Sequence, residues 1–199
     1  MGIIEILIDN NILLSLREAV QAVAPLLPVV VEAETLSEVV MFIQRRLYGW
    51  LRDQGFRHDL VEAVLAEQGD NPTQAAKALT ALNAWTPCPE FEPLLQAYNR
   101  VVRMIRGVQH RFQLTPEYLE EPAAQRLHAA YLTASAQATS KAIDDLITAM
   151  IQLVEPINAF LTDLLVMHED EGVRKARVGL LQRIAELPRG IVDLSKIDR

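Results

Sequence analysis

Four arginines recur at short intervals between residues 90 and 112, and their guanidinium groups could bind successive phosphates of a polyanion or stack on unpaired bases. These residues, called the arginine stripe below, are Arg100, Arg103, Arg106 and Arg111. On a helix from Glu90 to Phe112, at about 100° per residue, they share one arc and the apolar side chains share the opposite arc. No Asp or Glu lies between Glu92 and Glu117 to neutralise them from within the helix. The sequence therefore predicts an amphipathic helix with one strongly basic face.

The alternative interpretation of the stripe is an ordinary solvated helix face whose arginines pair with carboxylates of a neighbouring helix. The same two interpretations apply to a second basic cluster, which consists of Arg174, Lys175 and Arg177. Arg177 lies about 40° from Val173 around its helix, inside the apolar arc, so we expect it to be paired within the protein. Its candidate partners are Asp163, Asp170 and Asp193.

Residue types suited to catalysis or metal binding occur only in isolation. His58-Asp59 matches the dipeptide of metal-dependent phosphohydrolases, but the further separated ligands of such a site are missing, so we expect a structural pair at a helix start. Cys88 lies between two prolines with no histidine within twenty residues, and the eight glycines form no phosphate-binding loop. We therefore expect no catalytic residue, no metal and no cofactor in this chain.

The composition predicts an all-α protein that folds without disulfides. Half of the 199 residues are hydrophobic, and leucine and alanine supply 52 of them whereas glycine supplies only 8, which favours helices with short connections. The single cysteine indicates a reducing compartment, for which we expect the cytoplasm. The apolar runs are far shorter than the roughly 20 residues of a membrane-spanning helix. The net charge of −7 argues against nonspecific DNA binding.

The hydrophobic pattern predicts helices on both sides of Pro87-Cys88-Pro89, where two prolines remove backbone donors and fix φ. We therefore divide the chain into a helical region over residues 1–86 and a second helical domain over residues 87–199. The first region has 6 basic and 11 acidic side chains, and the second has 13 and 15. The sequence begins within an apolar helical pattern, and no N-capping residue precedes Ile3. We therefore expect a fragment of a longer polypeptide.

Breaker residues set the expected helix bounds. An apolar helix over residues 2–27 should break near Asn10-Asn11, and Gly55 should end a helix that begins at Thr35 or Ser37. Pro156 should interrupt the helical pattern of the second domain. The other helices are expected over residues 58–68, 73–85, 90–112, 123–154 as one helix or two, 157–167 and 171–187.

Four stretches of the sequence together resemble one known family. Residues 165–181 read LVMHEDEGVRKARVGLL and are followed by VDLSK at 192–196. The other three stretches are GIIEILIDNN at 2–11, FRHDLVEAVL at 56–65 and AYNRVVRMI at 97–105. Together they resemble the bacterial glycyl-tRNA synthetase beta subunit nearly from end to end. The stretch at 97–105 is also similar to the first helix of the anticodon-binding domain in arginyl-tRNA synthetases.

The resemblance implies a helical-bundle anticodon-binding domain from about residue 90 onward, preceded by a helical region, in a chain that binds tRNA(Gly). It also implies that aminoacylation, with its ATP and Mg²⁺, takes place in the separate alpha subunit of a heterotetramer. The expected tRNA-binding residues are Arg100, Arg103, Arg106, Arg111, Arg174, Lys175 and Arg177. Of these, Arg100, Arg174 and Arg177 match the family directly, whereas the other members of the stripe depend on the helical projection.

Two functions remain open from the sequence. In the first, the chain is the non-catalytic part of a glycine-tRNA ligase that grips the anticodon arm through arginine–phosphate contacts and contacts to unstacked bases. In the second, the same helices form a scaffold module that docks the alpha subunit or other beta-subunit domains without touching RNA.

Overall fold

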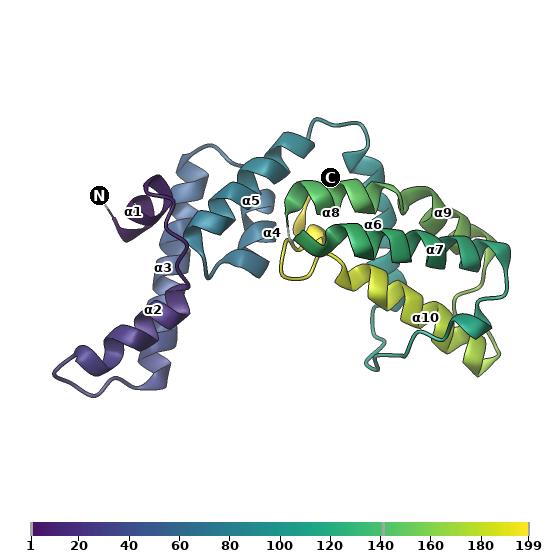
Figure 1. Cartoon of the computed structure of the whole chain (residues 1–199), viewed down its shortest axis with the longest axis horizontal. Helices are drawn as coiled ribbons and strands as arrows, with labels where there is room; N and C mark the ends of the chain where they lie inside the picture. Colours follow the sequence, from purple (N-terminus) through teal and green to yellow (C-terminus); the bar gives the residue numbers. More distant parts are fainter. Residues whose placement is uncertain (1, 141, 199) are drawn as a thin grey trace. The chain divides into compact units, whose positions relative to one another are not determined.

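The computed structural model describes residues 2–140 and 142–198, and within these ranges it contains helices and no β-strand (Figure 1). The all-α prediction is confirmed. The α-helices are α1 (Ile3–Asp9), α2 (Leu16–Val23), α3 (Ala33–Asp53), α4 (His58–Gln68), α5 (Pro72–Trp85), α6 (Phe91–Ile105), α7 (Pro122–Gln137), α8 (Ile143–Ile151), α9 (Val154–Asp163) and α10 (Glu171–Glu186). The 3-10 helices η1 (Ala24–Leu26), η2 (Pro116–Tyr118) and η3 (Ala138–Ser140) lie between α-helices, and η4 (Leu194–Lys196) follows α10. In the described ranges, no helix has the length and apolar character needed to cross a membrane.

The helices form two compact units. Unit 1 contains the residues up to Ala84 together with Gly190–Asp198, and unit 2 contains Trp85–Arg189. The division drawn from the sequence assigned residues 87–199 to one domain. The structure differs in the segment Gly190–Asp198, because its apolar side chains are buried in unit 1. These side chains belong to Ile191, Val192, Leu194 and Ile197.

Unit 1 is built around α3, which packs against α1, α2 and α4. The predicted break at Asn10-Asn11 is confirmed, because α1 ends at Asp9 and Asn11 has a positive φ of 54°. The side chain of Ser15 then caps α2 by accepting the backbone N–H of Glu18 at 3.1 Å. Helix α3 begins two residues before Thr35, with no capping bond from a side chain. The core includes Leu47, Leu51, Leu60 and Val64, all fully buried.

The segment Gly190–Asp198 is held on α4 by hydrogen bonds as well as by apolar contacts. Gln68 Nε2 donates to the carbonyl of Ile191 at 2.6 Å, and the backbone N–H of Asp193 donates to the carbonyl of Ala63 at 2.9 Å. At its far end, Asp59 Oδ2 accepts the backbone N–H of Asp198 at 2.9 Å. These bonds satisfy backbone groups that would otherwise be left without partners where the chain is buried.

Asp59 is a buried carboxylate, 1% exposed, at the start of α4. Burial acts to raise its pKa, but the hydrogen bond and charge of Arg57 and the N–H of Asp198 outweigh burial and hold the pKa below its ordinary value of 3.8. Arg57 Nε donates to Asp59 Oδ1 at 3.1 Å. Asp59 therefore links the start of α4 to the segment that returns from unit 2.

Acid should weaken unit 1 through Asp59. A carboxyl group with a lowered pKa in the folded state stabilises the fold above its unfolded pKa, and this stabilisation is lost as the pH falls through the folded pKa. We expect the free energy of unfolding of unit 1 to fall more steeply below about pH 4 in the wild type than in Asp59→Asn. The measurement is urea unfolding followed by Trp50 fluorescence, with Trp85 replaced by phenylalanine. Parallel pH profiles for the two proteins would contradict this role of Asp59.

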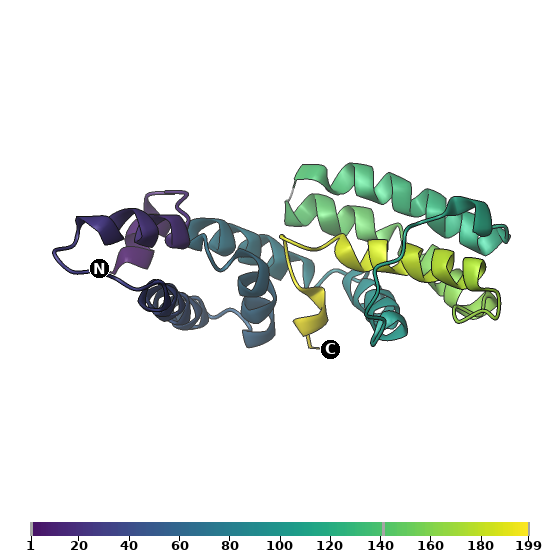
Figure 2. The ribbon, with the colours of Figure 1, turned by 90° about the horizontal axis from the view of Figure 1, so that it is seen from below.

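Unit 2 is a bundle of α6 to α10 in which α7 packs against α8 and α9, and α6 packs against α9 and α10 (Figure 1, Figure 2). The segment 123–154 forms two helices, which is one of the two predicted arrangements. The predicted interruption near Pro156 is confirmed: α8 ends at Ile151 and α9 begins at Val154, which places this proline in the first turn of α9, where no backbone donor is needed. The core includes Val101, Leu127, Phe160 and Leu180, which are fully buried.

Candidate nucleic-acid interface

Helix α6 carries the arginine stripe, and it is shorter than predicted. It ends at Ile105, because Arg106 leaves the helical conformation with ψ of 128° and Gly107 follows with a φ of 86°. The prediction of a helix that continues to Phe112 is therefore wrong. Arg106 caps the helix and Arg111 lies in the loop that follows, so the four arginines do not form one helical line.

The apolar arc of α6 is confirmed over most of its length. Phe91, Leu94, Leu95, Tyr98 and Val101 are all buried. Met104 is 37% exposed, although the projection placed it on the core face. The last turn of α6 therefore shows an apolar side chain at the surface next to two arginines.

Three arginines at the C-terminal end of α6 have no acidic partner among the residues that the structure describes. Arg100 Nη1 donates to Asn158 Oδ1 on α9 at 2.6 Å, and Arg103 Nε donates to the carbonyl of Asn99 at 3.2 Å. Both acceptors are neutral, and no carboxylate among the described residues pairs with Arg100, Arg103 or Arg106. Arg103 and Arg106 are exposed and Arg100 is half-buried. Arg100, Arg103 and Arg106 are called the α6 arginines below.

Arg111 has a different environment. Its Nη2 lies 2.6 Å from Glu186 Oε2 on α10, in a surface ion pair. The same loop is fixed to α10 by Gln182, which accepts the backbone N–H of Phe112 at 2.9 Å and donates to the carbonyl of His110 at 2.8 Å. Arg111 therefore helps to anchor the loop, and Glu186 offsets its charge.

The second basic cluster is distributed along α10 and is largely satisfied within the protein. Lys175 Nζ lies 2.6 Å from Glu171 Oε1, and this hydrogen bond and charge lower the pKa of Glu171. Arg174 Nη1 donates to the carbonyl of His168 at 3.1 Å. Both contacts are local to the first two turns of α10 and the loop before it.

Arg177 is 2% exposed and has no surface to offer to RNA. The prediction of an internal partner is confirmed, but the predicted aspartates were wrong: Nη2 pairs with Glu121, at the start of α7, and Nη1 donates to the carbonyl of Leu165 at 2.7 Å. Glu121 is 56 residues away in the sequence, so proximity along the chain could not identify it. Arg177 joins α10, α7 and the loop before α10.

A shallow pocket lies beside the α6 arginines. It has a volume of about 290 Å³ and is lined by Arg100, Arg103 and Met104 of α6 and by Leu161 of α9. Planar guanidinium groups and flexible apolar side chains are suited to covering the face of an unpaired base, and the charges are suited to its phosphates. The local sequence pattern has no signal for the contact between α6 and α9, which brings Leu161 next to Met104.

No group of three or more His, Cys, Asp or Glu side chains in the described ranges is placed to hold a metal ion. In the His58-Asp59 pair, Asp59 is bound to Arg57 and Asp198, and His58 Nε2 lies 3.3 Å from Asp198 Oδ2. The pair therefore joins α4 to the segment Gly190–Asp198, in agreement with the structural interpretation.

Comparisons with known proteins agree with one another. Residues 1–66 match the family model described as glycyl-tRNA synthetase beta subunit. Glycine-tRNA ligase, chloroplastic/mitochondrial 2, of Arabidopsis thaliana is 34% identical over 98% of this chain and 18% of its own length. The glycine-tRNA ligase beta subunits of Ruegeria sp. strain TM1040 and Geotalea uraniireducens are 30% and 33% identical, over 100% and 82% of this chain and 29% and 24% of their lengths.

The chain thus spans less than a third of the length of these relatives, while they match most or all of it. The matches extend through both units, well beyond the residues that the family model covers. The four sequence stretches quoted above pointed to the same relatives. Over nearly its whole length, the chain is similar to a part of the glycyl-tRNA synthetase beta subunit.

Proposed function

We propose that this chain binds the anticodon arm of tRNA(Gly) in the cytoplasm, as a non-catalytic part of a glycine-tRNA ligase. The observation that carries the proposal is the group of α6 arginines, which lack acidic partners among the described residues and lie beside the pocket of Met104 and Leu161. The choice of tRNA(Gly) as the bound RNA comes from the relatives, which are named glycine-tRNA ligases. In this proposal a separate alpha subunit holds the catalytic centre and uses ATP and Mg²⁺.

In this proposal the α6 arginines and the pocket bind different parts of a single-stranded loop. Arg103 and Arg106 are exposed and approach phosphates, whereas an unstacked base enters the pocket against Met104 and Leu161. The bond from Arg100 to Asn158 orients the Arg100 guanidinium at the pocket wall. Arg111, Lys175 and Arg177 are left out of this contact, because each is paired with a carboxylate. With a net charge of −7, the chain should bind weakly and with a strong dependence on salt.

The test compares Arg103→Met with Arg126→Met in titrations with tRNA(Gly). Both changes remove one exposed arginine from unit 2, but Arg126 lies on α7 and does not line the pocket. We expect Arg103→Met to weaken binding about tenfold and to reduce the slope of log K against log salt by about one, because one phosphate contact is lost. Arg126→Met should leave both values close to wild type. Equal effects of the two variants would refute the α6 interface.

Anticodon recognition is tested separately with a tRNA(Gly) whose anticodon bases are substituted, at two salt concentrations. We expect weaker binding of the substituted tRNA at both salts, since contacts to bases carry specificity whereas phosphate contacts do not. Equal affinity for the two RNAs would limit the interface to the phosphate backbone.

A protein-docking role is the second candidate, and exposed apolar side chains in unit 1 favour it. Leu26, Val29 and Val30, around η1, are 79%, 65% and 90% exposed. Exposed apolar patches of this kind often mark contacts between proteins. Capture of the ligase alpha subunit by this chain without tRNA, together with no protection of the anticodon in footprinting, would favour docking over RNA binding.

A further inference from the structure

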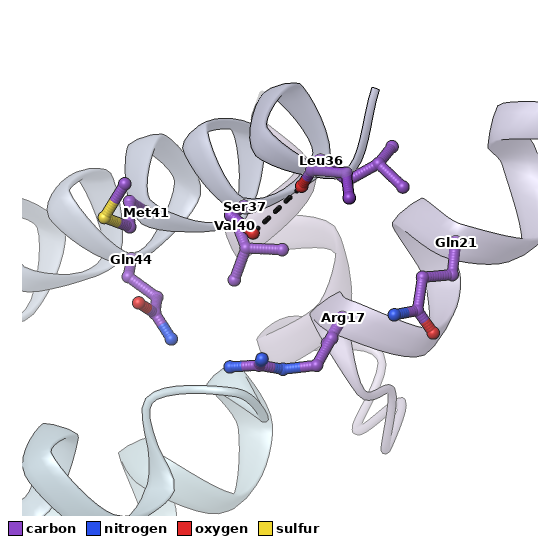
Figure 3. A pocket seen from close by; sticks show the side chains of 8 residues that line it. Arg17, Gln21, Leu36, Ser37, Val40, Met41 and Gln44 are labelled. Atoms are coloured by element: carbon purple, nitrogen blue, oxygen red, sulfur yellow. Dashed lines mark hydrogen bonds between the residues drawn. The ribbon is translucent and has the colours of Figure 1, made fainter. Parts of the chain in front are cut away.

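Unit 1 contains a second pocket, between α2 and α3, that the proposed function does not use (Figure 3). Its volume is about 340 Å³. The side chains that give it its chemistry are Arg17 and Gln21 from α2 and Ser37, Val40, Met41 and Gln44 from α3. No carboxylate lines this pocket, although acidic side chains outnumber basic ones in residues 1–86.

Arg17 supplies an unneutralised positive charge to the pocket. Its side chain extends toward Gln44 across the pocket (Figure 3). It makes no ion pair or hydrogen bond with any residue that the structure describes. The backbone N–H of Arg17 donates to Asp70 Oδ1 at 3.0 Å, which fixes the point from which the side chain starts. A guanidinium group placed in this way is suited to a ligand phosphate.

The two glutamines add a different kind of recognition. Each amide offers a donor and an acceptor side by side; the edge of an adenine base can bond to both, whereas an ionised carboxylate or phosphate accepts from the donor alone. Val40 and Met41 offer apolar surface for the face of a base. The volume lies at the lower end of the range of about 300 to 1,000 Å³ for small-molecule pockets and exceeds what a lone phosphate requires.

We infer that this pocket binds a single adenine nucleotide, with the phosphate on Arg17, beside Gln44, and the base edge on Gln21 at the opposite side of the pocket (Figure 3). An extended polyanion is disfavoured, because residues 1–86 carry 6 basic and 11 acidic side chains. One phosphate with one base matches the single arginine and the amide groups. The nucleotide is either free in solution or an unpaired nucleotide at the end of an RNA.

The test is calorimetric titration of the full chain with AMP, adenosine and ribose 5-phosphate. AMP should bind at least about tenfold more tightly than adenosine, and Arg17→Met should weaken AMP binding about tenfold or more and bring AMP and adenosine to similar affinity. Gln21→Leu should weaken AMP binding and leave ribose 5-phosphate binding unchanged. The matched control is Arg45→Met, which removes an exposed arginine of α3 outside the pocket and should leave AMP binding unchanged.

Circular dichroism confirms that each variant is folded before titration. Absence of AMP binding at millimolar concentration, or equal weakening by Arg17→Met and Arg45→Met, would overturn the inference. Competition between AMP and a hexanucleotide ending in adenosine distinguishes the sources: displacement of AMP assigns the pocket to an RNA end, and its absence assigns it to the free nucleotide. Because Arg17 is in unit 1, the Arg103→Met titration with tRNA(Gly) can fail or succeed independently of this result.

Discussion

Arg177→Met should lower the free energy of unfolding of unit 2 by about 3 kcal/mol. The guanidinium is almost completely buried and bonds to Glu121 and to the carbonyl of Leu165, so its loss leaves a carboxylate and a carbonyl without their donor. Removing one partner of a buried pair costs about 3 to 5 kcal/mol, and the lower end applies here because the pair is incompletely satisfied: Glu121 Oε2 and Arg177 Nε are buried without a hydrogen-bond partner. Methionine keeps most of the stem volume, which limits the contribution of a cavity.

The measurement is urea unfolding followed by Trp85 fluorescence, since Trp85 lies in unit 2 and Trp50, the other tryptophan, is replaced by phenylalanine. Glu121→Gln in the Arg177→Met background should recover part of the loss, because the unpaired charge is then removed. A midpoint equal to that of the wild type, with an unchanged urea dependence, would show that Arg177 contributes little to stability.

Phe160→Ala should destabilise unit 2 by about 3 to 5 kcal/mol. Phe160 is fully buried on α9 among core residues from α6, α7 and α10, so the truncation leaves a cavity that the surrounding helices cannot fill. Phe160 directly precedes Leu161 of the pocket and lies two residues after Asn158, the acceptor of Arg100. A loosened α9 should therefore also disturb the pocket wall.

Phe160→Leu is the matched control, since it retains most of the volume and should cost less than about 1.5 kcal/mol. Trp85 fluorescence in urea measures both variants in the same background. If the two substitutions were equally destabilising, the cost would come from a specific requirement for the ring rather than from the cavity.

Local breaker residues allowed much of the fold to be predicted from the sequence. Helix α4 has the predicted bounds of 58–68, because Gly55 and the turn before Pro72 isolate it on both sides. The end of α6 was missed because the apolar spacing continues past Gly107, and a glycine that adopts positive φ cannot be distinguished in the pattern from one inside a helix. Because α6 ends at Ile105, Arg100 and Arg103 lie on the helix, whereas Arg106 caps it and Arg111 lies in the loop that follows.

The parts of the candidate site that were not predicted depend on contacts between residues distant in the sequence. The partner of Arg177 is 56 residues away, and the pocket combines residues of α6 with Leu161 of α9. Met104 and Leu161 have apolar side chains at apolar positions, so no local rule separates a pocket wall from a core position. The arginines themselves were found because charge and periodicity are local properties.

The hydrogen bonds between Gly190–Asp198 and α4 have a consequence for the order of events on the ribosome. Unit 2 is one continuous stretch of chain and can acquire its native contacts as soon as it has emerged. Unit 1 is translated first, yet Gln68, Ala63 and Asp59 meet their partners only after the whole of unit 2 has been made. Until then, the apolar side chains of α4 that the segment Gly190–Asp198 covers in the folded chain are exposed to solvent. During this period a nascent-chain chaperone can bind them.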